Sequence, residues 1–217
     1  MAATLTYIHD PLCGWCYAAA PLVAAVADDP IAGVDLVLVH RALFSGAHAM
    51  PHTPEFARYA WSNDQRIAHL TGQPFSDAYR DGVLGNPARS IDSWNTALAK
   101  QAVDAMAPGR APAYLKLMQH ARFVAGADLT DRVVLAGLGA GLDLDAATLA
   151  EAIAAPATAE SATAERDRAA AMLARMGHNG VPLLVLDGGS GPQAVDHGRF
   201  LGQPAAFRAA LAERFAA

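Results

Sequence analysis

The chain has 217 residues, of which 53% are hydrophobic and 17% are charged, and its formal net charge is -5. This length can bury one substantial core, as one domain or as one domain carrying an insertion. The negative charge argues against a nucleic-acid partner, because such a partner requires basic residues that neutralise phosphates. No stretch stays apolar for the ~20 residues of a membrane span, and no signal-peptide pattern opens the sequence. We therefore expect no membrane partner and a cytoplasmic protein.

The first 40 residues predict a strand, a helix and a second strand. A β-like run covers residues 4–9, and the apolar, β-branched run Val34–His40 predicts a strand that is covered on both faces. Apolar residues spaced three and four apart predict a helix between them. We expect this helix to bend at Pro21, which removes the hydrogen bond to the Tyr17 carbonyl. The three elements together predict a right-handed β-α-β unit with parallel strands.

Both cysteines of the chain, Cys13 and Cys16, lie at the start of this helix. A disulfide between them would close almost no loop, so it would stabilise the fold very little. A lone Cys-x-x-Cys at a strand-to-helix junction is instead typical of redox catalysis. Structural zinc needs four ligands, and only His9, His178 or a second chain could supply the remaining ones. We therefore expect no metal.

The middle of the chain, from about residue 54 to residue 176, shows recurring helix signals and no convincing strand. Pro112 stands where a helix would begin, and Asp145 is a good helix N-cap. A stripe of small and apolar residues between positions 162 and 176 predicts a helix that Gly177 can terminate. The middle is thus predicted to be an all-helical block set into an α/β frame.

The α/β frame resumes near the C-terminus. Residues 181–187 form an apolar run typical of a strand, and Gly188 and Gly189 predict a turn toward a short strand near residues 193–196. Apolar side chains at every fourth position from Phe207 to residue 215 predict a closing helix.

These features together resemble the DsbA-like branch of the thioredoxin superfamily. The resemblance rests on residues 10–17 (Asp-Pro-Leu-Cys-Gly-Trp-Cys-Tyr), on the long helical insertion, and on Gly180-Val181-Pro182 before the late strand. More narrowly, the chain is similar to leaderless members described as predicted protein-disulfide isomerases. The resemblance implies an α/β thioredoxin fold with a large all-helical insertion after the second strand. It also implies a cis peptide bond before Pro182, lying against the cysteines.

This architecture implies three segments. Residues 1–52 would form the N-terminal part of the thioredoxin-like domain, residues 53–176 the helical insertion domain, and residues 177–217 the C-terminal part of the thioredoxin-like domain.

The position of the two thiols predicts a thiol-disulfide oxidoreductase or isomerase. Thiolate is the nucleophile in disulfide exchange. Cys13 lies at or just before the first helical turn, where free N-H groups and the helix dipole favour an anion. We expect Cys13 to be the catalytic nucleophile and Cys16, one turn further along, to be a buried resolving thiol. The partners would be protein or small-molecule thiols and disulfides, glutathione among them, with no cofactor beyond the redox-active disulfide.

The residues around the thiols are expected to set the redox balance and to contact substrate. Trp15 offers a neutral indole where family members with histidine have a potential cation. We therefore expect the Cys13/Cys16 couple to be less oxidising than that of a strongly oxidising family member. Gly14 would expose backbone N-H groups near the sulfur. Trp15, Val181 and Pro182 would form an apolar ledge that binds the substrate.

Two other functions remain open at this point. Glutathione-dependent relatives, the kappa-class transferases and the 2-hydroxychromene-2-carboxylate isomerases, share the insertion architecture. They typically have a serine where Cys13 stands here, so the complete cysteine pair favours redox chemistry. The second alternative, which is not an enzyme, is a thiol-based binding or metal-holding module. The direction of the reaction, the physiological substrate and the oligomeric state do not follow from the sequence.

Overall fold

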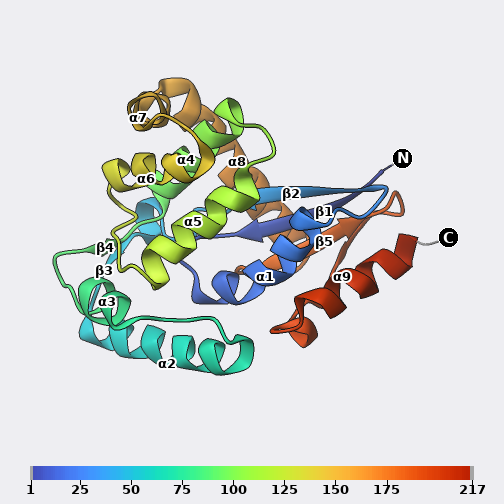
Figure 1. The fold of residues 1–217 in the computed structure, drawn as a ribbon, viewed down its shortest axis with the longest axis horizontal. Helices are drawn as coiled ribbons and strands as arrows, with labels where there is room; N and C mark the ends of the chain where they lie inside the picture. The colour runs from blue at the N-terminus through green and yellow to red at the C-terminus, as the bar shows by residue number, and fades with distance from the viewer. Residues whose placement is uncertain (1, 216–217) are drawn as a thin grey trace.

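A central sheet of four strands, in the order β2-β1-β5-β6, organises the fold (Figure 1). The computed structural model describes residues 2–215. The strands are β1 (Ala3–His9), β2 (Val34–His40), β5 (Leu183–Asp187) and β6 (Pro192–Ala194). Strand β1 pairs in parallel with β2 and antiparallel with β5, and β5 pairs antiparallel with β6. The parallel pairing of β1 with β2 confirms the predicted β-α-β unit.

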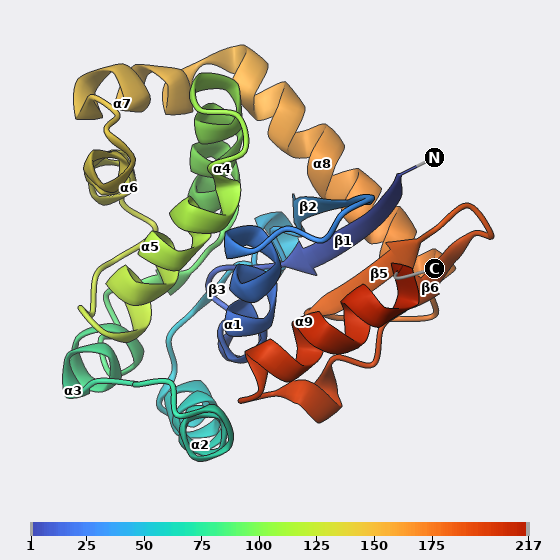
Figure 2. The same ribbon diagram turned by 45° about the vertical axis from the view of Figure 1, so that its right-hand side comes forward.

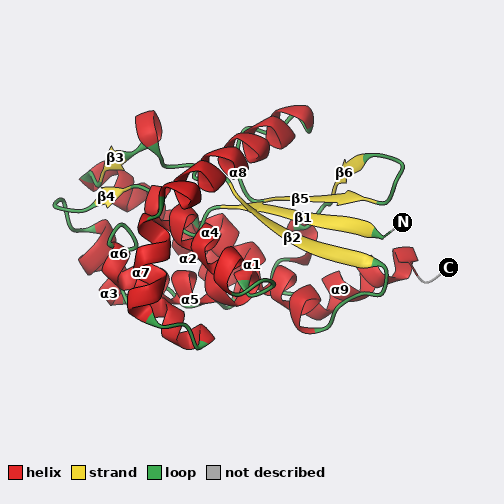
Figure 3. Ribbon diagram, turned by 90° about the horizontal axis from the view of Figure 1, so that it is seen from above, coloured by secondary structure: helices red, strands yellow, loops and turns green. Residues whose placement is uncertain are grey.

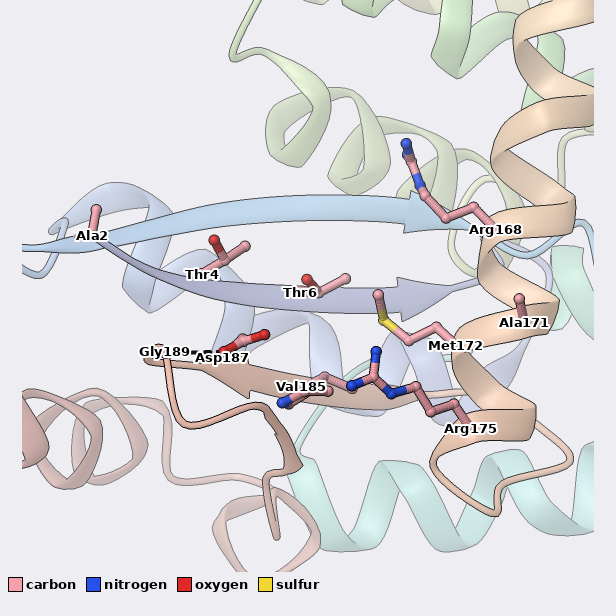
Figure 4. A pocket seen from close by; sticks show the side chains of 11 residues that line it. Ala2, Thr4, Thr6, Arg168, Ala171, Met172, Arg175, Val185, Asp187 and Gly189 are labelled. Carbon is pink, nitrogen blue, oxygen red and sulfur yellow. Dashed lines mark hydrogen bonds between the residues drawn. The ribbon is translucent and has the colours of Figure 1, made fainter.

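The burial of the strands follows their place in the sheet. In the central strand β1 every residue except Thr4 is buried. In the edge strand β2, by contrast, Asp35 and Val37 are exposed, and full burial is continuous only from Leu38 onward. The prediction that this strand is covered on both faces is therefore wrong for its first half. The reason is that α8 (Pro156–Arg175), the long helix on one face of the sheet, crosses the sheet near the carboxyl ends of β1 and β2 (Figure 4).

Helices pack on both faces of the sheet (Figures 1 and 3). One face carries α1 (Gly14–Asp28) and α9 (Pro204–Ala212), and the other carries α8 (Pro156–Arg175). Leu22 of α1 and Phe207 of α9 are almost completely buried and belong to the same hydrophobic cluster. The predicted closing helix is confirmed as α9, although the last residue of its stripe, Phe215, lies in a separate 3-10 turn.

Helix α1 continues through Pro21 without a break. The side-chain amide of Gln73 donates a hydrogen bond to the Tyr17 carbonyl, which is the acceptor that the proline leaves without its helical donor. A residue beyond α2 thus satisfies a backbone group inside α1. The bend that we expect at Pro21 stays a prediction.

The middle of the chain folds as the predicted helical block (Figure 2). Its helices are α2 (Pro54–Thr71), α3 (Asp77–Tyr79), α4 (Trp94–Met106), α5 (Ala111–Phe123), α6 (Arg132–Leu138) and α7 (Ala146–Ala154). A π-helical turn follows α3 at Arg80–Leu84. The prediction of no strand here is wrong in one place, because β4 (Ser90–Ile91) pairs antiparallel with β3 (Met50–Pro51). Two residues are too few to produce a periodicity that the sequence could show.

The predicted helix boundaries hold where capping chemistry is present. The Asp145 carboxylate accepts a hydrogen bond from the Thr148 N-H at 2.8 Å, which confirms it as the N-cap of α7. Helix α8 ends just before Gly177, whose φ is 70°, and the N-H of His178 donates to the Leu173 carbonyl at 2.9 Å. Within residues 2–215, no helix is both long enough and apolar enough to cross a membrane.

A buried ion-pair network joins the helical block to the sheet. The ammonium group of Lys100 on α4 lies 2.6 Å from Glu165 Oε2 on α8 and 2.8 Å from Asp104 Oδ2. The other oxygen of Glu165 accepts the backbone N-H of His40, the last residue of β2, at 2.9 Å. The side chains of Lys100 and Glu165 are 4% and 8% exposed, so their charges depend on each other rather than on water.

We expect Lys100→Met to lower the free energy of unfolding by about 3 kcal/mol, because it leaves the buried Glu165 carboxylate with only the more exposed Arg168, at 3.3 Å, as a cation. Urea denaturation monitored by circular dichroism measures the change. The double variant Lys100→Met/Glu165→Gln is the control, since it removes both charges and keeps an acceptor for the His40 N-H. The double variant should recover part of the loss, and equal stability of the two variants would contradict the role of the buried charge.

Candidate active site

Cys13 is placed at the start of α1 by the end of strand β1. It is the N-cap residue of the helix, with extended backbone angles, and its side chain makes no capping hydrogen bond. No acidic residue lies in the first turn, so the free N-H groups of the turn act on the sulfur without a competing carboxylate on the same helix. The Cys13 side chain is partly exposed, and its Sγ lies 3.7 Å from the Val181 carbonyl oxygen, to which the thiol can donate.

Cys16 lies behind Cys13 and is fully buried. Its Sγ accepts the backbone N-H of Asp10 at 3.4 Å, and its carbonyl accepts the Tyr7 hydroxyl at 2.8 Å. Burial raises the pKa of the Cys16 thiol well above its ordinary value, and the neighbouring Cys13 sulfur adds to the rise. The two thiols therefore differ in their access to solvent, and burial favours the protonated form of Cys16, as the sequence led us to expect for a buried second thiol.

The loop that carries Cys13 is held by a carboxylate whose function the sequence did not predict. Asp10 is fully buried, and its two oxygens accept the backbone N-H groups of Leu12 at 2.9 Å and of Leu43 at 2.7 Å. Its carbonyl also accepts the N-H of Cys13 at 3.1 Å. Asp10 thus ties the loop before α1 to the segment after β2. The Leu43 contact is 33 residues away in the chain, which explains why sequence patterns gave no sign of it.

The residues predicted to bind substrate lie on two sides of Cys13. The Val181-Pro182 peptide bond is cis, as the family resemblance implied, and its carbonyl contacts Cys13. Trp15 is partly exposed on the side of α2, where the guanidinium carbon of Arg66 lies 5.8 Å from the centre of its ring. The sequence suggested only a neutral indole here, and the structure adds a nearby cation. The assignment of these residues to substrate binding stays a prediction.

Gly14 has a structural reason that the sequence did not reveal. A Cβ atom at this position would lie 2.4 Å from Asp64 Oδ1 and 3.2 Å from Ile67 Cδ1, both on α2. A larger residue at position 14 would therefore force the Asp64 carboxyl group out of its present position. The contact brings a carboxyl group from the helical block to the backbone between the two thiols.

A cavity of about 290 Å³ opens beside Cys13 between the two parts of the fold. Asp64 lies in its wall, 3% exposed, and accepts the Tyr79 hydroxyl at 3.0 Å. Burial raises the pKa of Asp64 from 3.8 to about 6, against the lowering effects of the Tyr79 hydrogen bond and of Arg122. The remaining lining side chains are mainly apolar and aromatic: Leu12, Trp15, Phe44, Phe56, Tyr59, Ala60, Ile67 and Ile91.

A second cavity lies away from the thiols. It has a volume of about 600 Å³ and lies between the sheet and α8, where Thr4, Thr6, Arg168 and Arg175 contribute to its lining (Figure 4). No cysteine reaches this cavity, so it does not serve the thiol pair. Within residues 2–215, no group of three or more histidine, cysteine, aspartate or glutamate side chains is placed to hold a metal ion.

The different burial of the two thiols predicts different reaction rates. At neutral pH the Cys16→Ser variant, which keeps Cys13, should react with iodoacetamide faster than the Cys13→Ser variant by more than about tenfold. Cys13 is the more exposed thiol, and burial raises the pKa of the Cys16 thiol and so disfavours its thiolate. Mass spectrometry over a pH series gives the rates, and faster alkylation of the variant that keeps Cys16 would reverse the two assignments.

The raised pKa of Asp64 predicts a pH dependence of stability. The pKa of Asp64 is higher in the folded protein than in the unfolded chain. Its contribution to the free energy of unfolding is therefore fully present below pH 3.8 and is lost as the pH rises through about 6. The difference corresponds to about 3 kcal/mol. Asp64→Asn, which keeps an acceptor for Tyr79, should not show this loss. Urea denaturation at pH 4 and pH 7.5 tests this, and an identical pH dependence of both proteins would contradict it.

Comparisons with known proteins agree with this geometry. The family model of the DSBA-like thioredoxin domain matches residues 4–203. The solved cytosolic disulfide reductase DsbM from Pseudomonas aeruginosa is 36% identical, with a TM-score of 0.88 and 98% of each chain covered. The same protein solved with GSH is 35% identical, with a TM-score of 0.86 and again 98% of each chain covered. A search of curated protein sequences finds no match.

More distant structures share the fold. A structure from Nitrosomonas europaea is 20% identical, with a TM-score of 0.76, and 97% of this chain and 96% of that chain are covered. These findings confirm the expected thioredoxin fold with its helical insertion. The chain belongs to the family of DSBA-like thioredoxin domains and is a thiol-disulfide oxidoreductase.

Proposed function

We propose that the protein is a cytoplasmic disulfide reductase in which Cys13 is the nucleophile and Cys16 the resolving thiol. The observation that carries the proposal is the contrast between the two sulfurs. Cys13 is partly exposed at a helix start, 3.7 Å from the Val181 carbonyl, whereas Cys16 is fully buried one turn behind it. The proposed direction and compartment rest on the similar Pseudomonas aeruginosa protein, which is described as a cytosolic disulfide reductase.

The reaction proceeds in two exchanges. The Cys13 thiolate attacks one sulfur of the substrate disulfide, so that a mixed disulfide forms at Cys13 and the first substrate thiolate leaves. The Cys16 sulfur, after losing its proton, then attacks Cys13 Sγ and releases the second substrate thiolate. Two electrons and two protons pass in total from the dithiol to the substrate, which ends as two thiols, and the protein ends with a Cys13-Cys16 disulfide.

The environment of Cys16 keeps this thiol from acting as the nucleophile of the first exchange. Because burial raises the pKa of its thiol, Cys16 remains protonated while Cys13 reacts. The Tyr7 hydroxyl holds the Cys16 carbonyl at 2.8 Å and so fixes the first turn of α1. The resolving sulfur therefore stays one turn from Cys13, in position to attack the mixed disulfide.

Glutathione is the proposed reductant of the oxidised protein. Two glutathione molecules would reduce the Cys13-Cys16 disulfide and leave as glutathione disulfide, so no metal or further cofactor is needed. A related protein of 35% identity has been solved with GSH, which supports this choice. Trp15, Val181 and Pro182 would contact the apolar part of either partner beside Cys13.

Reduction of insulin disulfides, measured by turbidity with and without glutathione, tests the proposal. We expect glutathione-dependent turnover that falls by more than about a hundredfold in Cys13→Ser and in Cys16→Ser, since each variant interrupts one of the two exchanges. Arg58→Met, an exposed change on α2, is the matched control and should keep full turnover. Undiminished turnover in Cys13→Ser would refute the assignment, and conjugation of glutathione to an aryl halide without insulin reduction would indicate a transferase.

A further inference from the structure

The cavity beside Cys13 contains a buried arginine for which residues 2–215 provide no ion-pair partner. Arg122 on α5 is 4% exposed, lines the cavity, and has its Nε buried without a hydrogen-bond partner. Among residues 2–215, no carboxylate oxygen lies within 4.0 Å of its guanidinium nitrogens. A buried charge is strongly unfavourable unless an opposite charge or hydrogen-bond acceptors compensate it.

The protein groups around Arg122 compensate its charge only in part. Its guanidinium carbon lies 5.5 Å from the ring centre of Tyr79 and 5.8 Å from that of Phe123, so it rests on aromatic faces. Asp64 is the carboxyl group that shares the cavity wall, and one of its oxygens is taken by the Tyr79 hydroxyl. The raised pKa of Asp64 means that burial also disfavours its negative charge.

The other ionisable groups nearby are already accounted for. Arg89 and Asp128 face each other at 3.6 Å and so form a pair of their own. Burial and the neighbouring Arg122 lower the pKa of His52 to about 4, so that its ring is neutral at physiological pH. Arg122 is therefore the cation in the cavity wall to which the described part of the chain brings no anion within 4.0 Å, and a ligand anion can reach it from the cavity.

We propose that this cavity binds the carboxylate of a small-molecule thiol or disulfide, with Arg122 as its ionic partner, while the sulfur of the same molecule reacts with Cys13. The inference rests on the proposed function and names its substrate class. A volume of about 290 Å³ lies near the lower end of the range for small-molecule sites, so it suits a short peptide thiol. A guanidinium can also hold a carboxylate through two parallel hydrogen bonds, which fixes the ligand in orientation.

Asp64 and Arg122 should affect binding of the ligand carboxylate in opposite directions. Its carboxylate repels the ligand carboxylate, whereas Arg122 attracts it. Removing the charge of Asp64 should therefore strengthen binding of the charged substrate, and removing the charge of Arg122 should weaken it. A purely structural contribution of both residues would change reactivity in the same direction for every substrate.

The test is oxidation of the reduced protein by two disulfides, followed through the fluorescence of the tryptophans, of which Trp15 lies between the thiols. Glutathione disulfide carries carboxylates, and 2-hydroxyethyl disulfide is uncharged. Arg122→Met should raise the half-saturating concentration of glutathione disulfide by about tenfold or more, because one charge-assisted hydrogen-bonded pair is lost. The same variant should leave the rate with 2-hydroxyethyl disulfide within about twofold of the wild-type rate. Asp64→Asn should lower the ratio of the half-saturating concentrations of the charged and uncharged substrates.

Arg175→Met, at the end of α8 beside the second cavity, is the matched arginine control and should change neither substrate. Equal losses with both disulfides in Arg122→Met, or an unchanged ratio in both cavity variants, would overturn the inference. If the wild type reacts with neither disulfide, the proposed function fails instead. Calorimetry with S-methylglutathione, which cannot exchange with a thiol, then tests the Arg122 site separately. Binding to the wild type that is lost in Arg122→Met supports the site, and no binding to the wild type overturns it.

Discussion

The start of helix α1 at the carboxyl end of strand β1 is the constraint on which the site depends. The turn places Cys13 at the helix N-terminus, next to free backbone N-H groups, and places Cys16 one turn later inside the core. The buried Asp10 carboxylate holds this turn from both sides through the N-H groups of Leu12 and Leu43. One local geometry therefore gives two chemically identical side chains different access to solvent, and it raises the pKa of the buried Cys16 thiol.

The helical insertion contributes directly to this site. The main hydrophobic cluster includes Leu5 of β1 and Leu149 of α7, so the insertion and the sheet share one core. The two charged groups closest to the thiol cavity, Asp64 and Arg122, come from α2 and α5 of the insertion. The thioredoxin-like part thus supplies the sulfurs, and the insertion supplies the charges that a substrate meets beside them.

The features that local sequence signals predict are present in the structure. The Cys-x-x-Cys at a strand-helix junction, the capping carboxylate of Asp145 and the glycine that ends α8 each depend on neighbours within a few residues, and each is found as predicted. The cis bond before Pro182 followed from family resemblance rather than from physical reasoning. These features predict the fold class that the structure has, and they locate the cysteine pair at the start of α1.

What the sequence did not show depends on contacts between distant segments. Asp64 and Gly14 are 50 positions apart, yet a Cβ on Gly14 would overlap the Asp64 carboxyl group. Arg122 looks like one more charged residue of an amphipathic helix, and only packing against Tyr79 and Phe123 reveals that it is buried. Strand β2 is likewise an edge strand because it pairs only with β1 in the order β2-β1-β5-β6. The residues of β2 itself do not show how many neighbours the strand has.

Trapping of the mixed disulfide tests directly whether Cys13 is the attacking thiol and Cys16 the resolving thiol. The reduced Cys16→Ser variant is mixed with glutathione disulfide, and the product is mapped by peptide mass spectrometry. We predict one glutathione attached to Cys13, because the sulfur that would displace it is absent. An unmodified Cys13 in this variant, together with glutathione attached to Cys16 in the Cys13→Ser variant, would contradict the account.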